Sequence, residues 1–458
     1  MTAVISETTR RIYGDFFLKE VNTATDSDEY YIGIGKSDTY NATDTTIDPV
    51  QTRAQENDLR NNLQSIKKVE AASFVITRHN WSSGQVYQPY DTDVVGTSYS
   101  GGGSTSSRPY YVLTEDNEVF ICIQQARDPD GRGLGSVVKP AVPGGHDRNV
   151  PFKLSDGYVW KYLYSLSAGQ VNSFLSANFM PIEKVEKDSA QCNIFELAQL
   201  NVQNTARSGQ VLGIEVTTAG SGYSSAPTIT IRGDGRNAFA TATLNGTSVG
   251  KIEMDSFDAG LGINYNFAEV IISGGGGAGA VARPILSGKA GIGKDARDDL
   301  KASSVMFNIK PDGNQGGKFF VDQSFRQIGL FKNMEDSDGG GIFTGTAAIA
   351  LRKMKSSSAS SLTKGRELSD GGSPPIKAFI DAISDSDIFY HQNDSTGFGV
   401  FADDATTITD GIATITIDSA NIPGEVNPYS GEVLYMENRA RVVRDTTQTE
   451  DIKVIITV

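Results

Sequence analysis

The run Asp156-Gly-Tyr-Val-Trp-Lys-Tyr-Leu-Tyr-Ser-Leu166 decides the fold that we expect for this chain. A turn dipeptide, Asp156-Gly157, is followed directly by β-branched and aromatic residues, which favour strands. Because side chains alternate in an extended chain, four large rings share one face (Tyr158, Trp160, Tyr162 and Tyr164) and the other face is mixed. The run therefore predicts a central β-strand that is packed on one side, with phenol and indole groups reaching polar partners at its margin.

The composition indicates an ordinary globular chain with many tight turns. Of 458 residues, 38% are hydrophobic, 21% are charged and 49 are glycine, whereas proline is not enriched. The net charge of −14 argues against nucleic acid as a direct partner, since nucleic-acid binders usually carry a basic surface. Two cysteines, Cys122 and Cys192, exclude a disulfide scaffold and fit a reducing site of synthesis. With no secretory signal and no apolar run long enough to span a bilayer, we expect no membrane partner.

Shifts in composition predict a body that is interrupted twice. The expected fold class is mainly β: a multi-layer β-sandwich body with a few peripheral helices and an inserted two-repeat β-domain. The expected segments are the N-terminal part of the body (1–204), the inserted β-repeat domain (205–300), body strands (301–340), a second, loop-rich insertion with a β-hairpin (341–420) and C-terminal body strands (421–458).

Three local patterns add detail to this plan. An apolar stripe with helical spacing predicts a helix over 53–70 that packs on a sheet; its members are Leu59, Leu63, Ile66 and Val69. The run 376–383 predicts one or two helical turns. Residues 406–417, centred on the turn dipeptide Asp410-Gly411, predict the hairpin of the second insertion.

The segment from Val211 to Ala282 contains one supersecondary unit twice, at an offset of about 41 residues. Each copy consists of a strand, a Gly-x-Gly turn, a tyrosine (Tyr223 or Tyr265), a second strand, a Gly-rich turn and an alanine-alternating third strand. The string Gly220-Ser-Gly-Tyr-Ser-Ser-Ala-Pro227 resembles β-repeats on many phage and bacterial surface proteins. We therefore expect a small β-domain inserted into the body.

Four blocks of sequence resemble, in their order along the chain, the baseplate wedge subunits encoded by gene 8 of T-even-like contractile-tailed phages. They are Val75-Ile-Thr-Arg-His-Asn-Trp81 with Tyr87 and Pro89-Tyr90 after it, the run 156–166, Phe325-Arg-Gln-Ile-Gly329, and Gly431-Glu-Val-Leu-Tyr-Met-Glu-Asn-Arg439 with its continuation over 448–458. The resemblance covers about half of the chain and rests on unusual residue strings, not on a catalytic signature. Residues 205–300 and 340–420 have no counterpart in it.

This resemblance implies a structural function. It implies a subunit of a viral tail baseplate that is made and assembled in the cytoplasm of the host bacterium and becomes part of the virion. It implies a β-sandwich-rich homodimer that binds other wedge subunits, the products of genes 6, 7 and 10. Such a subunit is held by large interfaces and shifts as a near-rigid body when the baseplate changes shape on host contact.

No motif in the sequence points to catalysis, a metal or a cofactor. Gly274, Gly276 and Gly279 match G-x-G-x-x-G, but a strand-like run follows in place of the helix that a dinucleotide requires, so we interpret them as a repeat turn. The three histidines, His79, His146 and His391, show no metal-ligand spacing to one another or to the cysteines. Because no nucleophile-elbow, zincin or Walker string occurs, we expect no enzymatic activity and no cofactor.

Large amphipathic side chains are the candidates for a partner interface, because Trp, Tyr and Arg are enriched at such surfaces. The candidates are Trp81, Tyr87, Tyr90, Tyr110, Tyr111, Trp160, Arg439 and Arg441. The competing interpretation is that most of the rings belong to the core. Near the end of the chain, Arg439, Arg441 and Arg444 lie beside Glu437 and Glu450, and the sequence leaves open whether they form interface or intramolecular ion pairs.

Two other functional classes stay open. One is a receptor- or glycan-binding tail fibre or adhesion module, suggested by the Gly-Tyr β-repeat; fibres are commonly trimeric and carry more than two repeats. The other is a cell-wall hydrolase of the tail, which requires a pair of carboxylates in a cleft, and no pair stands out in the sequence.

Overall fold

The computed structural model describes residues 6–22, 28–92, 98–99, 108–128, 131–403, 406–445 and 447–457. The chain is mainly β, as predicted, with 40% strand against 13% helix and several antiparallel sheets. Within the described part of the chain, no helix has the length and apolar character needed to cross a membrane.

The chain forms two compact units, each of which is built from separated segments. Unit 1 consists of Met1–Gly14, Ser73–Val305 and Thr457–Val458, and unit 2 of Asp15–Ala72 and Met306–Ile456. The boundaries fall inside four elements, which are α1 (Glu7–Asn22), β3 (Ala71–Thr77), β19 (Ser304–Ile309) and β30 (Ile452–Thr457). The segment predicted as 1–204 therefore contributes to both units.

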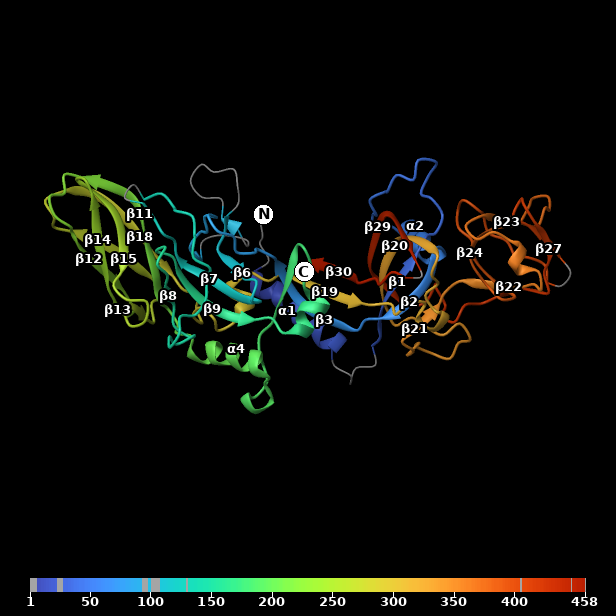
Figure 1. Ribbon diagram of the computed structural model, residues 1–458, viewed down its shortest axis with the longest axis horizontal. Coiled ribbons are helices and arrows are strands. Elements are labelled where there is room, and N and C mark those ends of the chain that lie inside the picture. Colours follow the sequence, from blue (N-terminus) through green and yellow to red (C-terminus); the bar gives the residue numbers. More distant parts are fainter. Residues whose placement is uncertain are drawn as a thin grey trace. The chain divides into compact units, whose positions relative to one another are not determined.

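The sheet built on the run 156–166 is the centre of unit 1. Its strand order is β6-β7-β9-β8, with bounds Tyr111–Leu113, Glu118–Gln124, Val159–Ser165 and Phe152–Lys153. Strand β9 is central, as predicted, and lies beside β7 (Figure 1). The rings of Tyr158, Trp160 and Tyr162 are buried in one apolar cluster with Phe120 and Phe152.

The prediction that β9 is packed on one side only is wrong. Lys161, on the opposite face, is only 5% exposed. Its ammonium donates a hydrogen bond to the Asn149 carbonyl at 2.6 Å, and burial lowers the pKa of Lys161 to about 8. The second face is covered because segments distant in the sequence pack on it, and a Cβ at Gly293 would lie 3.4 Å from the Lys161 side chain.

The remaining elements of unit 1 surround this sheet. They are β4 (Ser98–Tyr99), β5 (Arg108–Pro109), α3 (Ala168–Phe174), β10 (Phe179–Ile182), the short 3-10 helix η1 (Ser189–Gln191), α4 (Ile194–Thr205) and α5 (Ala296–Asp299). Helix α4 begins with a capping box in which the Asn193 and Glu196 side chains each bond the backbone of the other.

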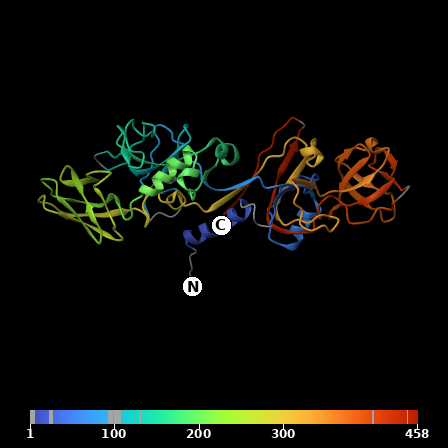
Figure 2. The same ribbon diagram turned by 90° about the horizontal axis from the view of Figure 1, so that it is seen from below.

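The β-repeat of unit 1 folds by pairing its two copies in a nested order. Its strands are β11 (Val211–Ser221), β12 (Thr228–Gly233), β13 (Arg236–Ala238), β14 (Ala240–Asn245), β15 (Ser248–Met254), β16 (Leu261–Ile263), β17 (Ala268–Ser273) and β18 (Ala278–Leu286). The antiparallel pairs are β11 with β18, β12 with β17, β13 with β16 and β14 with β15. Each copy therefore completes the other, and the strands lie together in both views (Figures 1 and 2).

One sheet of unit 2 has five strands. Its order is β21-β2-β1-β20-β29, with bounds Ala347–Ile349, Leu63–Lys68, Tyr30–Gly35, Gln323–Lys332 and Glu432–Arg444. Gly33 of β1 faces Gly329 of β20. A Cβ at Gly33 would lie 2.7 Å from Leu63 and 2.8 Å from Phe331, so the missing side chain makes room for those buried neighbours.

The predicted helix over 53–70 is wrong in its second half. Helix α2 spans only Arg53–Asn61, capped by Thr52 at its start and Asn62 at its end, and β2 follows at once. Strand β2 is covered on both faces, so it lacks the alternation that would have identified it. Its polar members are buried because they find partners; the Ser65 hydroxyl, for example, donates to the Lys318 carbonyl at 2.7 Å.

A second sheet of unit 2 has seven strands and lies almost entirely within the segment predicted to be loop-rich. Its order is β27-β26-β23-β24-β25-β22-β28, with bounds Thr414–Thr416, Thr407–Thr409, Glu367–Ser369, Lys377–Ser384, Asp387–His391, Arg352–Lys355 and Ser419–Ile422. Two short 3-10 helices, η2 (Gln315–Gly317) and η3 (Ala359–Ser361), complete the unit. The sheet encloses its own apolar cluster, which includes Met354, Ile380 and Tyr390.

Strand β24 overturns the prediction of helical turns over 376–383. Ala378, Ile380 and Ala382 are buried at every second position, which is the period of a strand. The short run also fits a helix when it is considered alone, and pairing with β25 decides between the two structures. The hairpin predicted over 406–417 is confirmed, since β26 and β27 are antiparallel partners.

We predict that Gly33→Ala lowers the free energy of unfolding of unit 2 by about 1–3 kcal/mol, because the new methyl group overpacks against Leu63 and Phe331. The measurement is urea denaturation followed by far-UV circular dichroism, because both tryptophans lie in unit 1. The control is Gly144→Ala, whose Cβ would meet nothing within 4 Å. Equal stability of the two variants would contradict the packing argument.

Candidate functional site

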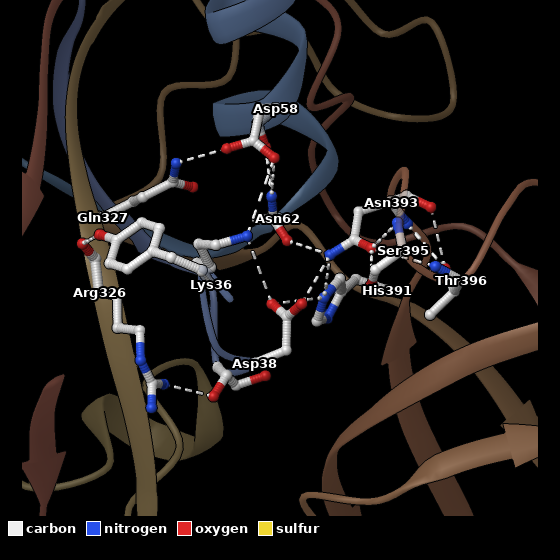
Figure 3. A network of polar contacts seen from close by, with 12 residues as sticks. Lys36, Asp38, Asp58, Asn62, Arg326, Gln327, His391, Asn393, Ser395 and Thr396 are labelled. Atoms are coloured by element: carbon white, nitrogen blue, oxygen red, sulfur yellow. Dashed lines mark hydrogen bonds and ion pairs between the residues drawn. The ribbon is translucent and has the colours of Figure 1, made fainter. Parts of the chain in front are cut away.

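A buried histidine held between two carboxylates is the centre of the polar cluster in unit 2. Figure 3 shows this histidine, His391, with one of the carboxylates, Asp38, and the amides beside them. His391 ends β25 and Asp381 lies in the neighbouring β24, and the two side chains meet through Nδ1 and Oδ2 at 2.7 Å. The β24–β25 ladder shifts register between Ile380 and Ala382, so Asp381 is the extra residue of a β-bulge. The bulge accounts for an inward carboxylate in a strand that is otherwise apolar.

The second carboxylate comes from the loop after β1. Asp38 Oδ1 lies 3.6 Å from His391 Nε2 and 3.7 Å from Lys36 Nζ. This oxygen accepts no hydrogen bond from any described residue, so the two nearby cations are its compensation. The other oxygen of Asp38 accepts a hydrogen bond from Asn393 at 3.1 Å.

A chain of amides continues the cluster toward the five-stranded sheet. Asn393 Nδ2 donates to Asn62 Oδ1 at 2.7 Å, and Asn62 in turn donates to the carboxylate of Asp58 at 2.9 Å. Asp58 also accepts a hydrogen bond from Gln327 of β20 at 2.8 Å. The cluster therefore connects the end of α2, the first strands of the five-stranded sheet and the hairpin β24–β25.

Arg326 closes the cluster on the side of β20. Its guanidinium bonds both oxygens of Asp44, at 2.9 to 3.1 Å, and donates to the Ser37 carbonyl at 2.6 Å. Arg326 is 4% exposed, so its charge is compensated within the fold. The loop that carries Asp38 is fixed in this way from both ends.

The electrostatics of the cluster keep the imidazole charged. Burial by itself lowers the pKa of His391, but the charge of Asp381 and the bond and charge of Asp38 outweigh it and raise this pKa to about 9. Burial raises the pKa of Asp38, but the bond and charge of His391, with the charge of Lys36, lower it overall to about 2. At neutral pH this raised pKa keeps the imidazole of His391 protonated.

This arrangement suits a structural role better than nucleophilic catalysis. The nearest hydroxyl on the same segment, that of Ser395, donates to Asn393 Oδ1 at 2.6 Å and not to the histidine. Both imidazole nitrogens already face carboxylates. The group is therefore a fixed charge that holds the loop after β1 to the hairpin β24–β25.

Sequence reasoning did not find this centre, although one signal was present. The polar cluster Ser384-Asp-Ser-Asp387 between two apolar runs is the mark of a hairpin turn. Reading it as a hairpin places Asp381 and His391 on adjacent strands at nearly matched distances from the turn. The contribution of Asp38, from a distant loop, has no local signal.

The structure places most of the predicted interface rings in the interior of unit 1. Five of the six aromatic candidates are at most 3% exposed; they are Tyr87, Tyr90, Tyr110, Tyr111 and Trp160. Tyr87 and Trp160 meet edge to face with ring centres 5.5 Å apart, and Tyr110 and Tyr111 meet at 5.2 Å. Their burial supports the core interpretation, because the large rings fill space between strands and loops. Trp81 is half-buried and bonds Ser136.

The arginines near the end of the chain separate into two kinds. Arg444 is 1% exposed, and its guanidinium bonds Glu450 at 2.8 Å together with the carbonyls of Phe320 and Gly313. Arg444 therefore forms an intramolecular ion pair with Glu450. The side chain of Arg439 is 41% exposed and lies 3.9 Å from Glu437, and Arg441 is exposed. These two arginines can still contact a partner.

The other motifs behave as structural features. Gly274, Gly276 and Gly279 all have φ of +79°, and the chain passes from them into β18, which begins at Ala278, so they form a repeat turn as interpreted. His79 packs on Tyr111 at 5.1 Å, and burial lowers the pKa of His79. Among the described residues, no group of three or more His, Cys, Asp or Glu side chains is placed to hold a metal ion.

No protein-family model matches this chain, and no curated protein matches it either.

We predict that raising the pH removes stability from unit 2. The His391 pKa is higher in the folded chain than the ordinary 6.5, so its contribution is complete below pH 6.5 and is lost as the pH rises toward about 9. Urea denaturation followed by circular dichroism between pH 6 and about 9.5 measures this loss. His391→Gln should remove most of the pH slope that His146→Gln retains, and an unchanged slope in both variants would contradict the assignment.

We predict that Arg444→Met destabilises unit 2 by about 3–5 kcal/mol, because Glu450 is left buried without its cation. Adding Glu450→Leu should restore most of this loss, since no buried charge remains. Arg439→Met is the matched control, and its partly exposed pair should change the free energy of unfolding by less than about 1 kcal/mol. Urea denaturation measures all three variants, and a double variant no more stable than Arg444→Met would count against the charge argument.

Proposed function

We propose that this protein is a structural subunit of the baseplate wedge of a contractile phage tail. In this proposal it forms a homodimer, binds neighbouring wedge subunits and is not an enzyme. It is assembled in the bacterial cytoplasm and ends as part of the virion. The proposal rests on the four blocks that resemble the gene 8 wedge subunits, and the place of those blocks in the fold supports it.

The observation that carries the proposal is that the four blocks meet in pairs. In unit 1, the first block reaches the second, since the backbone N–H of Tyr87 donates to the Tyr158 hydroxyl at 3.1 Å. In unit 2, the third block lies in β20 and the fourth in β29, and these strands are hydrogen-bonded neighbours with Gly329 opposite Met436. Blocks separated by many residues thus belong to two shared frameworks. If this chain and the gene 8 wedge subunits share a body and have diverged elsewhere, their sequences should still resemble each other in such frameworks.

The proposed mechanical role also fits the way unit 2 is stabilised. The His391 cluster, the Arg326–Asp44 pair and the Arg444–Glu450 pair all hold distant segments with charges buried in the fold. Buried pairs are costly to separate, because each partner would be left uncompensated. A unit held in this way moves as one body, which a subunit of a rearranging baseplate requires.

An adhesion module of a tail fibre is the alternative, and the nested repeat bears on it. The two copies of the β-repeat complete each other through four antiparallel pairs. Each strand of one copy pairs with a strand of the other copy, so two copies form a complete unit. The repeats of fibres, in contrast, stack in longer series. This favours the baseplate subunit over a fibre, with the repeat as an accessory domain.

We predict that the purified protein has a solution mass of twice 49.0 kDa by light scattering over a concentration series. A trimer would overturn the proposal in favour of a fibre, and a monomer at every concentration would contradict the homodimer.

Arg439→Glu combined with Arg441→Glu should raise the dimer dissociation constant at least about tenfold if these arginines lie at the interface. Arg232→Glu, at an exposed position of the repeat, is the control for added negative charge.

Location is tested separately on virions. In the phage that encodes the protein, antibodies against the β-repeat should label the baseplate in electron micrographs. Labelling of fibres, or of no part of the tail, would contradict the proposal. Pull-down with the neighbouring wedge subunits then tests assembly itself.

A further inference from the structure

The β-repeat and the body sheet of unit 1 enclose a hollow of about 490 Å³. Its walls come from β7 on one side and from β11, β15 and β18 on the other. This volume lies within the range of small-ligand sites. We propose that the hollow is a binding site for a neutral oligosaccharide, a function that goes beyond the structural role above and does not depend on it.

Glycines keep the hollow open. Gly213 of β11 lines it, and a Cβ built at this position would meet nothing within 4 Å. Gly131, Gly157 and Gly250 also line it. Walls without side chains leave room for a ligand and allow it to approach the backbone closely.

Fixed polar groups line one part of the hollow around Arg283. The guanidinium of this residue pairs with the carboxylates of Asp91 and Glu215, the latter at 2.7 Å. Asp91 belongs to the body and the other two to the repeat, so the three side chains are held between the two walls. The carboxylate oxygens and guanidinium N–H groups keep a defined direction, which favours recognition of ligand hydroxyls.

A second polar group lines the hollow around Glu253 of β15. Its carboxylate accepts hydrogen bonds from Gln124 at 3.2 Å and from Lys153 at 3.5 Å, and pairs with Lys251 at 2.7 Å. Lys153 and Glu253 keep half and a third of their side-chain surface exposed. This group therefore presents both donors and acceptors to a molecule in the hollow.

The charges of the described lining residues cancel. The four acidic residues of the lining are matched by four basic ones, since Asp156 and Arg127 complete the two groups above. A balanced lining gives no advantage to a phosphate, a polyanion or a cation, because each would meet as many like charges as opposite ones. A ligand that carries many hydroxyls, each both donor and acceptor, uses the two kinds of polar group without bringing a charge.

Apolar side chains form the rest of the lining and suit the same ligand. Ile123, Ile214, Val216, Val249 and Ile252 are among them. A sugar ring has C–H faces as well as a hydroxyl edge, so aliphatic side chains cover the faces while the polar groups bind the edge. Neutral saccharides match both parts of the lining.

The test uses the full chain and an occluding variant. Neutral tetrasaccharides of glucose (maltotetraose and cellotetraose) and of N-acetylglucosamine are screened by saturation-transfer NMR, and any that bind are titrated by calorimetry. Gly213→Trp places a large ring on the wall of the hollow, and its Cβ meets no atom within 4 Å at a position where φ is ordinary. Gly144→Trp, at an equally open position outside the hollow, is the control. Glu253→Gln removes one acceptor charge at nearly constant volume.

We expect at least one saccharide to bind, with affinity reduced at least about tenfold by Gly213→Trp and by Glu253→Gln but unchanged by Gly144→Trp. Affinity should change by less than about twofold between low and high salt, since the ligand is uncharged. Failure of every saccharide to bind, or equal binding by both tryptophan variants, would overturn the proposal. Circular dichroism of each variant verifies the fold, so that loss of binding is not loss of structure.

Discussion

The fold of unit 2 depends on charges that are buried in compensating sets. An imidazolium in the interior carries a large desolvation cost, and it is tolerated here because Asp381 and Asp38 face its two nitrogens. Neither carboxylate is tolerable without the histidine, since each is at most 8% exposed. The three groups thus require one another, and they come from a loop after β1 and from the hairpin β24–β25. Separating the loop from the hairpin would remove Asp38 from the imidazolium, which Asp381 alone would then face.

Packing of the five-stranded sheet obeys a second constraint, which is steric. Gly33 and Gly329 face each other, and both lack the side chain that would collide with Phe331. The ring and the neighbouring leucines then fill the space above the sheet. Because the glycines and the ring must be present together, this part of the core is specified by shape as much as by hydrophobicity. Charge compensation and steric fit therefore act on the same strands, β1 and β20.

The sequence predicted the elements whose pattern is local. The aromatic alternation of 158–164, the turn at Asp410-Gly411 and the two-copy repeat all appear in the structure. The errors in the secondary structure have local causes: β2 is buried on both faces and lacks alternation, and the short run of β24 fits a helix equally well when it is considered alone. The polar centre needed information that no local pattern holds, because the bulge at Asp381 and the approach of Asp38 arise only from tertiary contacts. The burial of the aromatic candidates shows the same limit, since a Tyr in a core and a Tyr at an interface have the same local sequence.

The two units use charge in opposite ways. In unit 2 the charges at His391 and Arg444 are buried and paired within the fold. In unit 1 the pairs at Arg283 and Glu253 stay partly exposed and face a hollow that glycines keep open. An accessible charged group can exchange a hydrogen bond to water or to a protein group for one to a ligand hydroxyl at a small cost in free energy. A buried pair would have to be separated first, which leaves each charge uncompensated. Accessibility, and not the number of charges, is therefore what distinguishes a candidate binding site from a structural clamp in this protein.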